Sequence, residues 1–156
     1  PSPKDVATYD LKPEMSAYLV TEELLRRMDS ESYSFIVINF ANGDMVGHSG
    51  IMEAAVKACE VVDTCLGKIV DKFSEKGGIV VITADHGKAE TMCDLQTQCP
   101  ITAHSSNPVP FILISEQYKN AKLRQGGSLR DIAPTILSLQ NLPIPHEMTG
   151  RSLILP

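Results

Sequence analysis

The sequence has no hydrophobic run long enough to cross a membrane and no cluster of basic residues. Its apolar segments fall well short of the roughly 20 residues that a transmembrane helix needs. The 14 lysines and arginines are outnumbered by 19 acidic residues, for a net charge of −5, and aromatic residues make up only 5% of the chain. We therefore expect neither a membrane nor a nucleic acid as partner, and an anionic substrate must be held by local groups.

The chain also lacks a Cys-X-X-Cys pair and the dense cysteine spacing of small secreted proteins. Its four cysteines, Cys59, Cys65, Cys93 and Cys99, are predicted to be free thiols in a reducing cytoplasm. At 156 residues the chain has the size of one domain. It begins at Pro1 without an initiator Met or a signal peptide, which predicts a cytoplasmic segment cut from something longer.

Short apolar runs and amphipathic segments alternate along the chain. Three runs rich in Ile and Val, residues 35–40, 79–82 and 109–114, predict strands buried on both faces. Strands of this kind, separated by helices, predict an α/β fold with a mainly parallel sheet and helices on both faces. The segment 88–107 is the one long connection without a periodic pattern, and such connections are usually functional or mobile.

Three helices are predicted between and around these strands. The first begins at Pro13-Glu14, and the last follows Ser128, where residues 128–131 resemble a capping box. The longest ends at Gly77-Gly78 and places apolar residues at three- and four-residue spacing. Its predicted inward stripe consists of Met52, Ala55, Val56, Cys59, Val62, Leu66, Ile69, Val70 and Phe73.

Acidic and histidine side chains follow the predicted strands. Asp44 and His48 come after the first strand, Asp85 and His86 directly after the second, and His104 shortly before the third. Because ligand sites in parallel sheets form beyond the carboxyl ends of the strands, these five side chains should meet at one edge. The remaining histidine, His146, lies between prolines and is predicted at the surface.

Imidazole and carboxylate groups are preferred ligands of Mn²⁺, Zn²⁺, Fe and Co²⁺. Adjacent Asp85 and His86 cannot both reach one ion without strain, so two neighbouring ions explain them better. Two ions roughly 3.5–4 Å apart suit phosphate-ester chemistry. The alternative is a set of unrelated residues, in which a histidine bonds within a turn and an aspartate caps a helix. The convergence of five such residues favours the metal centre, but their spacing identifies no substrate.

One segment is specific to a known family. Residues 42–50 read N-G-D-M-V-G-H-S-G and closely resemble the N-G-D-M-V-G-H-T-G motif of cofactor-independent phosphoglycerate mutases. The segments A-T-Y-D-L-K-P-E-M-S, T-A-D-H-G, T-A-H, L-R-D-I-A-P-T and M-T-G follow that family's order over essentially the whole chain. Asp-His-Gly alone would indicate only the wider alkaline-phosphatase-like superfamily.

The resemblance implies an incomplete alkaline-phosphatase-like domain, of which residues 1–156 form the C-terminal part. It also implies interconversion of 2-phosphoglycerate and 3-phosphoglycerate through a phosphoserine, assisted by two divalent ions. The ion is expected to be Mn²⁺, with Mg²⁺, Co²⁺ or Zn²⁺ as alternatives. By resemblance, Asp44, His48 and His104 bind one ion, and Asp85 and His86 bind the other.

The same resemblance assigns partners outside these residues. The nucleophilic serine, a further aspartate and an inserted transferase domain would belong to the rest of the same polypeptide, a cytoplasmic monomer acting on phosphoglycerate. Lys4 matches the family's active-site lysine, a compact cation that offsets phosphate charge. The sequence departs from the family at Lys88, where Asn is usual, and at Asp5, an extra residue after Lys4. Ser49 is predicted to cap the following helix rather than act as a nucleophile.

Two other functions remain open at this stage. A phosphopentomutase or metal-dependent phosphatase of the same superfamily would share the metal ligands and differ in the inserted domain. A non-catalytic chain that binds metal or a partner would need no nucleophile.

Overall fold

The computed structural model describes residues 2–155, which group into two compact units that divide between Ile114 and Ser115. Helices and a small sheet together confirm the α/β class. In the described part of the chain, no helix combines the length and apolarity that a membrane crossing needs. The elements of the first unit are a 3₁₀ turn (Tyr9–Leu11), α1 (Ala17–Ser30), α2 (Asn42–Gly47), α3 (Met52–Glu75), β1 (Val80–Thr83) and β2 (Phe111–Ile114).

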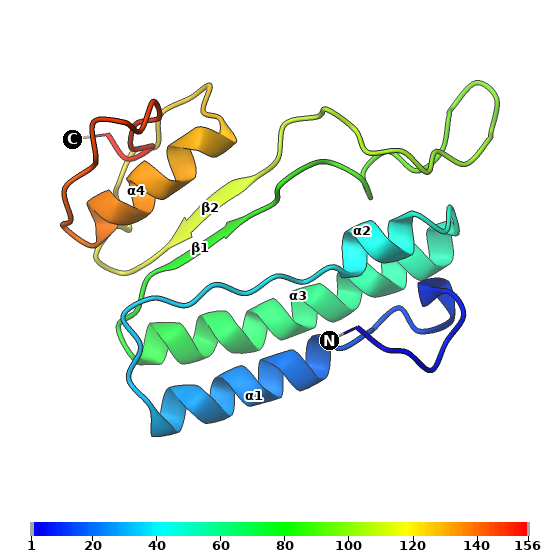
Figure 1. Cartoon of the computed structure of the whole chain (residues 1–156), viewed down its shortest axis with the longest axis horizontal. Coiled ribbons are helices and arrows are strands. Elements are labelled where there is room, and N and C mark those ends of the chain that lie inside the picture. The colour runs from blue at the N-terminus through cyan, green and yellow to red at the C-terminus, as the bar shows by residue number, and fades with distance from the viewer. Residues whose placement is uncertain (1, 156) are drawn as a thin grey trace. The chain divides into compact units, whose positions relative to one another are not determined.

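Helices α1 and α3 lie side by side and run in the same direction (Figure 1). The expected first helix begins later than predicted, at Ala17 instead of Pro13-Glu14. The reason is a long-range contact, because the buried Asn42 amide donates to the carbonyls of Pro13 at 2.8 Å and Glu14 at 3.0 Å. Residues 13–16 therefore form turns, and Met15 takes a positive φ of 47°.

Helix α3 has the predicted extent, but the face it buries was predicted only in part. Its buried stripe consists of Ala54, Ala55, Ala58, Val61, Cys65 and Ile69, whereas Met52, Val56 and Cys59 are exposed. The difference arises from alanine, since Ala54 and Ala58 let the fully buried Val46 of α2 pack closely against α3. The positions of large apolar residues do not identify the buried face of a helix when that face consists largely of alanine.

The predicted first strand, residues 35–40, is extended but pairs with no other strand among residues 2–155. Ile36, Ile38 and Phe40 pack on the α1–α3 layer, whereas Phe35 and Val37 are 54% and 77% exposed. The segment alternates as a strand does, but only one of its faces is covered, not both as expected. It runs in the same direction as β1, with α3 returning between them, which is the chain path of a βαβ unit (Figure 1).

Strands β1 and β2 pair antiparallel, in a register from Val80↔Ile114 to Thr83↔Phe111. This pair differs from the mainly parallel sheet predicted above. Parallel neighbours need a crossover, usually a helix, to return the chain to the same end of the sheet. The connection between β1 and β2 contains no helix, so the chain comes back in the opposite direction.

The second unit contains a 3₁₀ turn (Leu129–Asp131) and α4 (Ile132–Leu139). The predicted capping box is confirmed, with the Ser128 N–H donating to Asp131 Oδ2 at 2.9 Å. The backbone N–H groups of Arg151 and Ser128, together with the Arg124 guanidinium, hold the pKa of the Asp131 carboxyl well below its usual range. This buried carboxylate therefore fixes the start of α4 by charge-assisted hydrogen bonds.

Candidate metal centre

Helix α2 presents Asp44 and His48 on the same face. Residues four apart on a helix are neighbours, and here Asp44 Oδ1 lies 3.1 Å from His48 Nε2. The helix is anchored by Val46, which has no exposed surface and packs on α3 from between these two residues. The buried Asn42 side chain fixes the start of α2 through its hydrogen bonds to the turn before α1.

His86 and His104 come from the two sides of the long connection between β1 and β2. His86 follows β1, and His104 lies on the segment that returns toward β2. An isolated antiparallel bridge joins Gly87 to Ser105, with Ser105 N–H donating to the Gly87 carbonyl at 2.8 Å. The two imidazoles consequently stack, with ring centroids 3.8 Å apart and planes at 15°.

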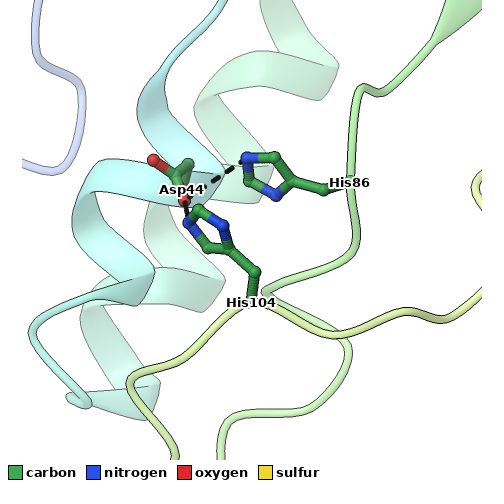
Figure 2. A group of neighbouring side chains, drawn as sticks. All are labelled: Asp44, His86 and His104. Atoms are coloured by element: carbon green, nitrogen blue, oxygen red, sulfur yellow. Dashed lines mark ion pairs between the residues drawn. The ribbon is translucent and has the colours of Figure 1, made fainter.

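Three imidazoles converge on one oxygen atom of Asp44. Asp44 Oδ1 lies 3.0 Å from His104 Nε2, 3.1 Å from His48 Nε2 and 3.9 Å from His86 Nε2. Figure 2 shows the imidazoles of His86 and His104 turned toward the Asp44 carboxylate. Asp44, His86 and His104 each offer one ligand atom, and these atoms lie within 4.8 Å of one another.

The Asp44 oxygen at this centre lacks a conventional partner. Asp44 Oδ1 is buried, and no described residue donates a hydrogen bond to it, despite three imidazole nitrogens within 4 Å. No lysine or arginine in residues 2–155 forms an ion pair with Asp44. A buried carboxylate oxygen without a hydrogen bond is costly, and a cation bound among these atoms removes that cost.

The orientation of His48 also fits a cation. Its Nδ1 lies 2.8 Å from the Thr102 carbonyl oxygen, which can only accept, so Nδ1 carries the hydrogen. The neutral ring then has its lone pair on Nε2, which faces Asp44 Oδ1 and lies 3.1 Å from His104 Nε2. Metal-binding histidines are typically oriented in this way, by a carbonyl on the nitrogen opposite the metal.

Asp85 and Lys4 do not join this cluster. The Asp85 side chain is 79% exposed, and its only close imidazole is that of His86, with Asp85 Oδ1 3.7 Å from His86 Nε2. Lys4 is exposed and forms no hydrogen bond or ion pair with another residue in the described range. His86 thus lies between the Asp44 group and Asp85. His146 is at the surface as predicted, with 94% of its side chain exposed.

Three other residues noted in the sequence have defined contacts in the structure. Lys88 is buried, with 4% of its surface exposed, and its Nζ donates to the Ile101 carbonyl at 3.1 Å. Asp5 pairs with Lys12 at 2.8 Å. The expectation that Ser49 caps α3 is wrong, because Ile51 holds the cap position, and the Ser49 hydroxyl donates to the Val46 carbonyl at 2.6 Å.

Comparisons with known proteins identify a family and several relatives of this chain. The family described as the Metalloenzyme superfamily matches residues 1–144. The chain is 60% identical over 154 residues to 2,3-bisphosphoglycerate-independent phosphoglycerate mutases of Clostridioides difficile and of Clostridium botulinum, covering 99% of this chain and 30% of each relative. It also superimposes on a crystal structure of Leishmania mexicana phosphoglycerate mutase at low cobalt concentration, with a TM-score of 0.88, 28% identity and 99% of this chain covered.

The α/β fold and the histidine and aspartate cluster beside its strands fit a class of proteins that bind divalent metals. The chain belongs to the Metalloenzyme superfamily. It spans about 30% of the length of the curated phosphoglycerate mutases that it matches, and 30% of the Leishmania chain.

Proposed function

We propose that this chain is the C-terminal, metal-binding part of a cofactor-independent phosphoglycerate mutase that interconverts 2-phosphoglycerate and 3-phosphoglycerate. The observation that carries the proposal is the buried Asp44 oxygen, which has three imidazoles around it and no hydrogen bond from the described residues. The 60% identity to bisphosphoglycerate-independent mutases extends over almost the whole chain, which favours a mutase over a phosphatase or a phosphopentomutase.

The residues fit two divalent ions. Asp44, His48 and His104 would hold the first, since their ligand atoms approach within 3.1 Å of one another. His86 and Asp85 would hold the second, which fits the longer separation of His86 from Asp44 and its proximity to Asp85. By the family resemblance, the proposed ion is Mn²⁺, with Co²⁺, Zn²⁺ or Mg²⁺ as substitutes.

Asp44, His48 with its Thr102 partner, and Lys4 would have different roles in such a centre. When bound, the ions neutralise phosphoryl charge and lower the barrier to displacement at phosphorus. The Asp44 carboxylate supplies negative charge that retains a cation, and the Thr102 carbonyl keeps the His48 lone pair directed at the site. Lys4, as a free ammonium, would balance substrate phosphate charge once the rest of the polypeptide positions it.

The remainder of the polypeptide would supply the nucleophilic serine, a further aspartate and the transferase domain. The extended segment 35–40 has an exposed apolar face that includes Phe35 and Val37. This face supports the proposal that the missing polypeptide packs on it. Met52 and Val56 on α3 are likewise apolar and exposed. Faces of this kind are normally covered in a complete domain. We place the whole enzyme in the cytoplasm as a monomer that takes part in glycolysis.

The proposal predicts metal-dependent mutase activity in the native-length polypeptide that carries this sequence. Removing metal with a chelator should lower turnover of 3-phosphoglycerate by ~10³-fold or more, because the ions contribute several kcal/mol of charge stabilisation. Added Mn²⁺ should restore it without any bisphosphoglycerate. The measurement is an enolase-coupled assay of 2-phosphoglycerate formation.

Two results would contradict the proposed activity. Full turnover after chelation would show that the reaction does not depend on a metal. Release of inorganic phosphate without formation of 2-phosphoglycerate would identify a phosphatase instead, while leaving the metal centre in place.

A further inference from the structure

Glu90 joins the segment after β1 to the segment that returns toward β2. Its Oε1 accepts hydrogen bonds from the Ser105 hydroxyl and from Asn107 Nδ2, the latter at 3.0 Å. Its Oε2 accepts from the backbone N–H of Lys88 at 2.7 Å. All three partners donate, so an ionised carboxylate satisfies every one of them. The Ser105 hydroxyl is the largest cause that lowers the pKa of Glu90 to about 2, which keeps the carboxylate ionised at neutral pH.

Two histidines of the metal centre lie directly beside these anchors. His104 precedes Ser105, and His86 precedes Gly87. A single backbone hydrogen bond, from Ser105 N–H to the Gly87 carbonyl, joins the two segments at this bridge. The same two segments are joined again farther along, where Ile101 N–H donates to the Met92 carbonyl at 2.8 Å. The side-chain contacts of Glu90 lie between these two backbone bonds and add to them in holding the segment that carries His104.

The contact at Gly87 is close. A Cβ placed on Gly87 would collide with both the Ser105 hydroxyl and the Glu90 carboxylate, which fill the space above that residue. The sequence therefore needs glycine at this position for Glu90 to reach across. The network continues to Thr91, whose hydroxyl oxygen lies 3.1 Å from Asn107 Nδ2.

A second anchor holds the other end of the same segment. The buried Lys88 ammonium donates to the carbonyl of Ile101, and the carbonyl of Thr102 accepts from His48. His104 is thus held from both sides, by Lys88 before it and by Glu90 after it. Of the two, Glu90 is exposed and reaches the residue next to His104, so it can be changed without opening a cavity.

We propose that Glu90 is a positioning residue of the metal centre, which fixes the His104 imidazole against Asp44 by holding Ser105 and Asn107. Within residues 2–155, the hydrogen bonds of Glu90 go to Lys88, Ser105 and Asn107, and to none of the five metal-ligand candidates. The inference rests on the proposed metal-dependent function, and it adds to that function a residue outside the ligand set.

The test replaces Glu90 by glutamine in the native-length polypeptide. Glu90→Gln preserves shape but turns an NH₂ group toward one of three donors, so at least one contact is lost. We expect Co²⁺ affinity to fall roughly 10-fold to 100-fold, the usual effect of residues that orient ligands. The visible absorption of bound Co²⁺ should also change, since a displaced imidazole alters its coordination. The matched control is Glu116→Gln, which lies outside the metal centre and whose side chain is 89% exposed.

Further variants separate positioning from loss of fold. Ser105→Ala removes the hydrogen bond between the Ser105 hydroxyl and Glu90 by changing the donor instead of the acceptor. It should change Co²⁺ affinity and absorption in the same direction as Glu90→Gln. Combining it with Glu90→Gln should cost less than the sum of the two single changes, because the two side chains share one hydrogen bond. If Glu90→Gln unfolds the protein, Ser105→Ala carries the test: a Co²⁺ spectrum and affinity like those of Glu116→Gln would overturn the inference.

Co²⁺ binding by the unmodified polypeptide distinguishes failure of the proposed function from failure of the positioning role. Failure of the unmodified polypeptide to bind Co²⁺ would overturn the proposed function and this inference together. Normal Co²⁺ binding in the unmodified polypeptide, with affinity and absorption unaltered in a folded Glu90→Gln variant, would overturn the positioning role alone.

Discussion

Asp44→Asn in the native-length polypeptide is expected to lower Mn²⁺ affinity and mutase turnover by ~10³-fold or more. Asp44 Oδ1 lies at the point where the imidazoles of His48, His86 and His104 converge, so its carboxylate brings a negative charge within 4 Å of all three ligand nitrogens. An amide of the same shape removes that charge and places an NH₂ donor or a weaker oxygen at the centre. Several kcal/mol of lost stabilisation correspond to this factor.

The matched control is Asp71→Asn, which changes an exposed aspartate of α3 outside the cluster. It should leave metal binding and turnover within about twofold of the unmodified protein, since surface substitutions of this kind have little effect. Mn²⁺ binding is followed by the loss of the free-ion signal in electron paramagnetic resonance. Retention of tight Mn²⁺ binding by a folded Asp44→Asn protein would exclude Asp44 as a ligand.

The 156-residue chain alone is expected to show no detectable conversion of 3-phosphoglycerate, even with Mn²⁺ supplied. The described residues bring together metal ligands but no activated nucleophile beside them. Ser49 is the hydroxyl nearest to His48 in sequence, and it is engaged on both sides, donating to the Val46 carbonyl and accepting from Ile51 N–H at 3.2 Å. Positioned ions cannot replace a missing nucleophile, because transfer through a covalent intermediate needs both.

The same enolase-coupled assay tests this expectation with the purified chain. Adding the remaining polypeptide in trans should restore some turnover if the two parts associate. Turnover that follows the isolated chain through purification would show that the nucleophile lies within it, and loss of that turnover in Ser49→Ala would identify the residue.

The helices were predictable from the sequence to a greater extent than the sheet. The spacing of apolar residues gave the limits of α3 to within two residues, and the Ser128 to Asp131 pattern located the start of the last helix. The antiparallel pairing of β1 and β2 could also have been predicted, because residues 88–107 show no helical pattern and so offer no crossover helix. That residues 35–40 pair with no other strand in the described part of the chain could not have been predicted, since strand pairing depends on residues far away in the sequence.

The site was predictable because its chemistry is concentrated in short motifs. Asp44 and His48 after the first predicted strand, His86 after the second and His104 before the third meet in the structure, whereas Asp85 stays outside the cluster. The four-residue spacing of Asp44 and His48 could also have indicated a helix, which is what the structure shows. The contacts of Lys88 and Glu90 could not be predicted from the sequence. They join residues 13 and 15 positions apart, across a connection without a periodic pattern.

Anomalous diffraction from crystals of the native-length polypeptide grown with Mn²⁺ tests the central claim most directly. We predict one manganese peak bound by Asp44, His48 and His104, and a second roughly 3.5–4 Å away bound by Asp85 and His86. A single peak that takes His86 together with Asp44 and His104 would contradict the two-ion assignment. The absence of any manganese at Asp44 in an active, Mn²⁺-dependent crystal would contradict the metal centre itself.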